Sequence, residues 1–142
     1  MAKKTSKLMK LRNKADRLIT KLYTGQPCII CKQLGIINTY RTCGHHCVNR
    51  SLSGYLRHDL LNIIPLCPSH HKFSNEIAAH STYQPAQVAF VEWLRKYQPD
   101  RYDLLMNYKQ MQGKIDYAKR VEELELALSI PPFGEDVIFG GI

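Results

Sequence analysis

The chain has 142 residues, of which 44% are hydrophobic and 23% charged, and its formal net charge is +8. This length suits one domain with a modest core, and no apolar run reaches the roughly 18 residues that span a bilayer, so a membrane protein is not expected. The basic start lacks the apolar stretch of a secretory signal, which predicts a cytoplasmic protein.

The positive charge is concentrated at the front of the chain. Residues 1–22 hold eight Lys and Arg against one acidic residue, whereas residues 76–142 hold seven against ten. Apolar residues recur at helical spacing from Lys7 to Tyr23, and Gly25 and Pro27 then break the pattern. We therefore expect residues 1–24 to form a basic N-terminal helix that faces a polyanion, with a solvated leader lacking a partner as the alternative.

The next predicted unit comprises residues 25–80. Its segment from Cys28 to Pro68 has little helical periodicity. The pattern predicts two short extended segments, near 40–42 and 63–66, separated by a long polar loop. Because Pro68 can occupy the first turn of a helix, a short helix is expected from Ser69. This helix would carry His70, His71 and Asn75.

Three helices are predicted for a C-terminal extension over residues 81–130. Apolar residues at helical spacing place them at 85–97, 102–111 and 115–128. Pro99 and Gly113 separate them, and a Pro-Pro pair ends the last one. The acidic residues of the last helix are typical of a solvated face. No structure is predicted for the tail, residues 131–142.

The cysteines favour a metal site over disulfides, because an odd number of them in an intracellular chain is poorly suited to a disulfide framework. All five lie between Cys28 and Cys67. Two pairs of metal-ligand residues share one spacing, and they are Cys28, Cys31, Cys67 and His70. Three thiolates and one imidazole complete the tetrahedral shell of a structural Zn²⁺. Cys43 and Cys47 are rival ligands with a less favourable spacing.

Five polar residues near these pairs have no part in such a zinc site: His45, His46, Asn62, His71 and Asn75. The segment from Asn62 to Lys72 resembles the second half of the signature of HNH (His-Me finger) nucleases. The pair His45-His46 corresponds to the first half, and Asn62 follows His46 by 16 residues, close to the family's usual spacing. This resemblance covers residues 28–75. More weakly, the basic helix and the segment 90–102 resemble phage recombination nucleases of the NinG/Rap group.

The resemblance implies an α+β fold, with a zinc-stapled ββα-metal (HNH) core flanked by the N-terminal basic helix and the C-terminal helical extension. It implies one catalytic Mg²⁺ or another divalent ion and hydrolysis of DNA phosphodiester bonds, leaving a 5′ phosphate. The weaker likeness suggests branched or recombination DNA as substrate, in the cytoplasm of a bacterial host if the chain is of phage origin.

The resemblance also implies roles for the residues. Histidine suits a general base at neutral pH because its pKa is near 6.5. By the family pattern His46 is the base and His45 a ligand of the catalytic ion, although an alternative register makes His45 the base. His71 and Asn75 would complete the ligands from one helix face, and Asn62 would hold the loop that bears the base. Imidazole ligands suit Zn²⁺, Ni²⁺, Co²⁺ or Mn²⁺ as well as Mg²⁺.

Basic side chains near the predicted site and along the N-terminal helix are candidates for phosphate contacts with DNA. They are Arg41, Arg50, Arg57, Lys72, Lys10, Lys14 and Arg17. Each could equally form a surface ion pair. His58 and His80 are expected to be surface residues without a role. The alternative functions are a non-catalytic zinc-stabilised nucleic-acid-binding module and a protein-interaction adaptor that acts through the acidic C-terminal helices.

Overall fold

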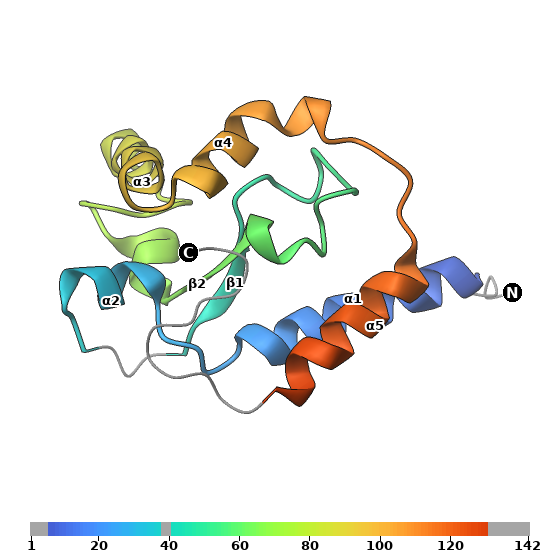
Figure 1. The fold of residues 1–142 in the computed structure, drawn as a ribbon. Helices are drawn as coiled ribbons and strands as arrows, with labels where there is room; N and C mark the ends of the chain where they lie inside the picture. The colour runs from blue at the N-terminus through green and yellow to red at the C-terminus, as the bar shows by residue number, and fades with distance from the viewer. Residues whose placement is uncertain (1–5, 38–40, 131–142) are drawn as a thin grey trace, which may run out of the picture.

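The computed structural model describes residues 6–37 and 41–130. It has an α+β fold that is mostly helical, with a two-stranded sheet between the helices (Figure 1). The elements in chain order are α1 (Lys7–Tyr23), α2 (Ile29–Leu34), β1 (Cys43–His46), η1 (Leu60–Asn62), β2 (Ile63–Leu66), η2 (Ser69–Phe73), α3 (Gln84–Tyr97), α4 (Pro99–Asn107), η3 (Tyr108–Gln110) and α5 (Tyr117–Ser129). Among the described residues, none of the helices combines the length and apolar character needed to cross a bilayer.

Helix α1 has the bounds that its periodicity predicts, and it packs along α5 although the two are far apart in the sequence (Figure 1). The Ser6 hydroxyl caps its first turn by accepting from the Met9 backbone N–H at 3.1 Å. The buried cluster between the helices and β2 comprises Ala15, Leu18, Ile19, Leu22, Tyr23, Ile63, Val121, Leu124 and Ala127. An ion pair between Lys14 and Glu125 at 3.0 Å spans the same interface. One face of α5 is therefore covered by α1, and only the other is solvated.

Strands β1 and β2 pair antiparallel, with His45 opposite Ile64 and His46 opposite Ile63. The second strand lies where it is predicted. The prediction of the first, at 40–42, is wrong by three residues, because the partner strand and not the local composition sets the register. At Gly44 an added Cβ would lie 3.0 Å from the Ile63 side chain, so a larger residue here would force Ile63 to shift.

Two short helical segments flank the sheet, and the sequence predicts them poorly. Helix α2 is not predicted at all, since six residues carry too little periodicity to detect. The helix predicted from Ser69 is a single π-helical turn that ends at Phe73, so Asn75 lies beyond it and is exposed. The Ser74 hydroxyl ends this turn by accepting from the backbone N–H groups of the two residues at 76 and 77.

The helices of the C-terminal extension exist as predicted, with shifted ends. Helix α4 begins at Pro99 instead of residue 102, because proline is well suited to a first turn, and its last turn continues as η3. Helix α5 begins after Asp116, whose carboxylate accepts from the Lys119 backbone N–H at 3.1 Å. A second buried cluster joins α2, β2 and α3 through residues that include Ile30, Leu66 and Trp93. The predicted tail, residues 131–142, lies outside the described residues.

Candidate metal centres

Three thiols and one imidazole meet in the buried cluster next to β2. His70 Nδ1 lies 3.6 Å from Cys28 Sγ, 3.3 Å from Cys31 Sγ and 3.4 Å from Cys67 Sγ, and the last two sulfurs are 3.7 Å apart. Ligands of a tetrahedral zinc ion would be about 3.6 Å apart for sulfur and nitrogen and about 3.8 Å for two sulfurs, given the usual bond lengths. This cluster could hold a structural metal such as zinc.

Different elements supply these four ligands. Cys28 precedes α2 and Cys31 lies within it, Cys67 follows β2 directly, and His70 belongs to η2. The rival thiols do not join them: Cys43 is exposed on β1, and Cys47 packs at the edge of the apolar cluster. Burial raises the pKa of Cys28, so a metal that binds here must displace the proton of that thiol.

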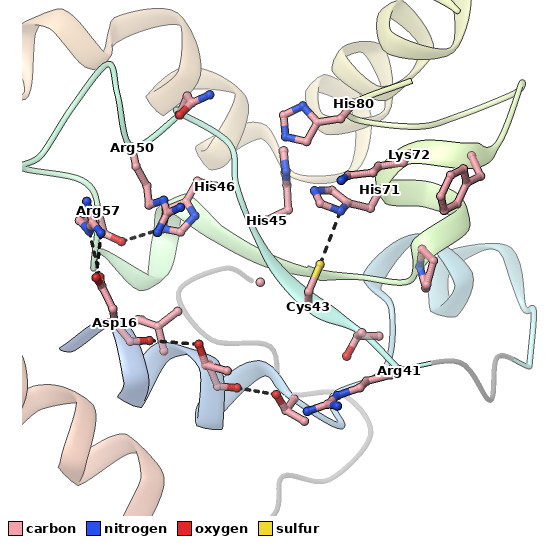
Figure 2. A pocket seen from close by; sticks show the side chains of 18 residues that line it. Asp16, Arg41, Cys43, His45, His46, Arg50, Arg57, His71, Lys72 and His80 are labelled. Atoms are coloured by element: carbon pink, nitrogen blue, oxygen red, sulfur yellow. Dashed lines mark hydrogen bonds and ion pairs between the residues drawn. The ribbon is translucent and has the colours of Figure 1, made fainter. Parts of the chain in front are cut away.

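A second cluster consists of three histidines that line a cavity in front of β1. One ring nitrogen from each of His45, His71 and His80 lies within 4.8 Å of the others, and the three rings point toward one another (Figure 2). The ring centroids are 5.4 Å apart for His45 and His71, 4.8 Å for His45 and His80, and 5.0 Å for His71 and His80. His45 also rests edge-on against Phe90.

These imidazoles are suited to bind a cation. Burial lowers the pKa of His45, His71 and His80, and the neighbouring histidines and Lys72 lower it further. Each ring is therefore neutral near pH 7, the form that coordinates metal. His45 and His71 are the ligands that the sequence pattern predicts, whereas Asn75 lies outside the cavity lining.

The sequence gives little sign of the third histidine in this cluster. His80 follows His71 by nine residues in an irregular segment, and it is exposed, as the sequence predicts, but its ring lies in the histidine cluster. Backbone hydrogen bonds place it: Ala79 N–H donates to His70 O at 3.0 Å, and His80 N–H donates to His71 O at 2.7 Å. The chain after η2 thus turns back along η2, a contact that no residue spacing encodes.

His46 lies apart from the three-histidine cluster but lines the same cavity. Its Nε2–H donates to the backbone carbonyl of Arg57 at 2.8 Å (Figure 2). This bond leaves Nδ1 as the unprotonated nitrogen of the ring. Burial lowers the pKa of His46, an effect that the bond to Arg57 only partly offsets. The imidazole is therefore mostly neutral at pH 7.

Asn62 is completely buried beneath the loop that joins the two strands. Its Oδ1 accepts from Val48 N–H at 2.7 Å, and its Nδ2 donates to the carbonyls of Val48 at 3.0 Å and Leu56 at 3.1 Å. One amide therefore ties the start of the loop to its middle. This is the placement that the predicted loop-holding role requires.

A cavity of about 950 Å³ lies in front of β1, between α1 and η2. Of the predicted phosphate-contacting residues, Arg41, Arg50, Arg57 and Lys72 line it. Arg57 differs from the rest because it is held in an ion pair with Asp16 at 2.7 Å. The predicted contacts on α1, namely Lys10, Lys14 and Arg17, lie outside the lining, and Lys14 is paired with Glu125.

His58 is buried, which contradicts the expectation that it is a surface residue. Its Nε2 lies 2.6 Å from Asp16 Oδ1, so the same carboxylate that binds Arg57 also binds His58.

The site thus comprises a buried Cys₃His cluster, three convergent histidines and a fourth histidine on a cavity with basic residues. The chain matches no protein family, no curated protein and no solved structure.

Proposed function

We propose that this chain is a metal-dependent endonuclease of the HNH type that hydrolyses phosphodiester bonds in DNA. The observation that carries the proposal is the arrangement of the four histidines in one cavity. Three of them converge as ligands, and the fourth, which lines the same cavity, has an unprotonated Nδ1. The Cys₃His cluster would anchor this arrangement by tying η2, which bears His71, to α2 and β2.

The donor set of the proposed catalytic ion is three neutral imidazoles. Imidazole suits Zn²⁺, Ni²⁺ or Co²⁺, whereas Mg²⁺ prefers oxygen ligands, so this site favours a transition-metal ion over Mg²⁺. Three protein ligands leave room for a further ligand, as is usual in catalytic sites. When bound, the ion would supply positive charge to the phosphate and to the departing oxygen.

His46 is the favoured general base. Its Nδ1 can accept a proton from water, because Nε2 carries the ring proton and holds it against the Arg57 carbonyl. The lowered pKa keeps this nitrogen free of a proton at neutral pH. His45, in contrast, is buried among the other two imidazoles, which suits a ligand.

The cations on the cavity wall would bind the substrate backbone. Arg41, Arg50 and Lys72 are exposed and line the cavity from both sides of the histidine cluster. Such side chains contribute affinity and position the duplex or strand without reading its sequence. Branched DNA, which arises in recombination, is the substrate that the sequence resemblance suggests.

The test is cleavage of linear, supercoiled and branched DNA with a series of divalent ions, for the wild-type protein and two variants. His46→Ala should abolish cleavage while keeping the metal content of both clusters, because it removes the base alone. His45→Ala should lose the catalytic ion as well as cleavage. If His46→Ala cleaves as well as wild type, the proposed mechanism is wrong.

DNA binding without cleavage under any of these conditions would favour the non-catalytic zinc-stabilised module. The adaptor hypothesis has less support, because the apolar residues Val121, Leu124 and Ala127 of α5 are buried against α1. Failure to bind DNA at low salt would nevertheless move the weight of evidence to that hypothesis.

A further inference from the structure

A carboxylate on α1 holds two consecutive residues of the loop between β1 and β2. Asp16 accepts from Arg57 Nε–H at 2.9 Å and Nη2–H at 2.7 Å, and His58 Nε2 lies 2.6 Å from the same carboxylate. The Arg57 side chain is 21% exposed and that of His58 is 1% exposed. Both partners are thus fixed in largely buried positions, 41 and 42 residues away in the sequence.

Asp16 is negatively charged at neutral pH, as a partner for Arg57 must be. Burial alone would raise its pKa, but the hydrogen bonds from Arg57 and His58 outweigh that effect and lower the pKa to about 2. The group is therefore a carboxylate throughout the neutral range. A two-pronged bond from arginine to a carboxylate fixes direction as well as distance.

The loop residue held by this carboxylate is the one that binds His46. The Arg57 side chain reaches Asp16, and the Arg57 backbone carbonyl accepts the Nε2–H of His46 (Figure 2). Asn62 holds the loop from beneath through Leu56, the residue before Arg57. Asp16 holds it from the side of α1, so the carbonyl is fixed on both sides.

We propose that Asp16 is a positioning residue for His46, acting through Arg57. This inference rests on the proposed function, since it assigns a role to the nitrogen that would accept the proton. By fixing the Arg57 carbonyl, Asp16 keeps the ring proton of His46 on Nε2 and Nδ1 free. Helix α1 would then hold the proposed general base in place, in addition to offering basic side chains to DNA.

The competing role of Arg57 is a contact to the phosphate backbone. That role would require the guanidinium to leave Asp16, which would leave this partly buried carboxylate with His58 as its remaining partner. The two roles predict different kinetics. Loss of a phosphate contact raises KM, whereas loss of the positioning bond lowers kcat with KM unchanged.

The first experiment measures the tautomer of His46 by ¹H–¹⁵N correlation spectroscopy on the full chain, and it needs no activity. We expect the wild-type ring to carry its proton on Nε2 and the Asp16→Asn ring to show both tautomers. The control is Glu125→Gln. This variant breaks the ion pair between Glu125 on α5 and Lys14 on α1, and it should leave the tautomer of His46 unchanged. An Asp16→Asn spectrum identical to that of the wild type would overturn the proposal.

The second experiment measures kcat and KM for Asp16→Asn, Arg57→Lys and the double variant, with the melting temperature of each as a check of folding. Removing a group that orients a functional side chain typically costs about 10-fold to 100-fold in activity, and we expect that loss in kcat. The double variant should lose no more than either single one, since both break the same connection. A raised KM with normal kcat, or additive losses, would contradict the proposal.

The two experiments separate this inference from the proposed function. If the wild-type protein cleaves no DNA, the proposed function fails, and the tautomer of His46 still decides whether Asp16 positions the ring. If the wild type cleaves and Asp16→Asn cleaves equally well, the nuclease stands and the positioning role is wrong.

Discussion

Neighbouring residues His45 and His46 can serve different chemistry because successive side chains of a strand point to opposite sides. His45 turns into the three-histidine cluster, where burial keeps its ring neutral. His46 turns toward the Arg57 carbonyl, which fixes its protonated nitrogen. Under the proposed function, this pair would supply one metal ligand and one proton acceptor, and both residues line the cavity.

The choice between His80 and Asn75 as the third ligand can be tested with the metal alone. His80→Ala should weaken Co²⁺ binding at the histidine cluster by at least about tenfold. Substituting a residue that only orients a metal ligand already lowers the metal affinity by about that factor. Asn75→Ala is the matched control and should bind Co²⁺ as the wild type does, since Asn75 lies outside the cavity lining. The measurement is titration followed by the visible absorption of Co²⁺, and the opposite result would restore Asn75 as the ligand.

The ion pair of Asp16 predicts a pH dependence of stability. Its pKa of about 2 in the folded chain lies below the ordinary value of 3.8, so the carboxylate stabilises the fold above pH 4. As the pH falls from about 4 to about 2, the unfolded chain takes up the proton first, and this contribution is lost. The free energy of unfolding of wild type minus that of Asp16→Asn should therefore shrink across this range in urea titrations. A difference that stays constant down to pH 2 would show that the carboxylate is not held in this way.

Residue spacing predicts the site only where ligands are close in sequence. The Cys₃His set is predicted by two Cys/His pairs of equal spacing, whereas His45 and His71 are predicted only through the resemblance to HNH nucleases. His80 and Asp16 could not be predicted, because backbone bonds in an irregular segment place the first and contacts across 41 residues define the second. Arg57 illustrates the same limit: its charge is visible in the sequence, but its partner is not.

At the scale of the elements, a metal bound to the Cys₃His cluster would compensate for segments that are too short to be stable alone. Helix α2 has six residues and η2 a single turn, and isolated helices of this length are not stable in water. The longer helices, in contrast, follow from their apolar periodicity, and α1 and α3 have nearly the predicted bounds. Tertiary contacts set the short elements, which explains why the sequence predicts them poorly.

Removal of a metal from the Cys₃His cluster should therefore destabilise the fold. A chelator strong enough to strip the Cys₃His cluster is expected to lower the melting temperature and the helical circular dichroism, and added Zn²⁺ should restore both. Cys67→Ser should behave like the stripped protein. Cys43→Ser is the control, because this exposed thiol lies outside the cluster, and it should keep its bound zinc. Equal loss of zinc in both variants would point to Cys43 as a rival ligand.

At the scale of the whole molecule, the packing of α1 on α5 neutralises part of the basic front of the chain. Lys14 pairs with Glu125, and Asp16 pairs with Arg57, so two predicted DNA-contacting cations are already partnered. The exposed cations that line the cavity, together with Lys10 and Arg17 on α1, are left as the candidates for binding phosphate. The net charge of +8 is unchanged by these pairs, because it already counts both partners, but two fewer cations are available to contact phosphate.

The salt dependence of DNA binding tests where the polyanion lies. Each lysine or arginine that neutralises a phosphate adds about one to the slope of log K against log salt, so Arg41→Ala and Lys72→Ala should each lower that slope by about one. Lys109→Ala is the control, because Lys109 is exposed on η3 and outside the cavity lining, and its slope should equal that of the parent. Fluorescence anisotropy over a series of salt concentrations, with His46→Ala as the parent protein to prevent cleavage, gives these slopes. Equal slopes for all three variants would mean that DNA binds away from the histidines, and the cavity could not then be the site of hydrolysis.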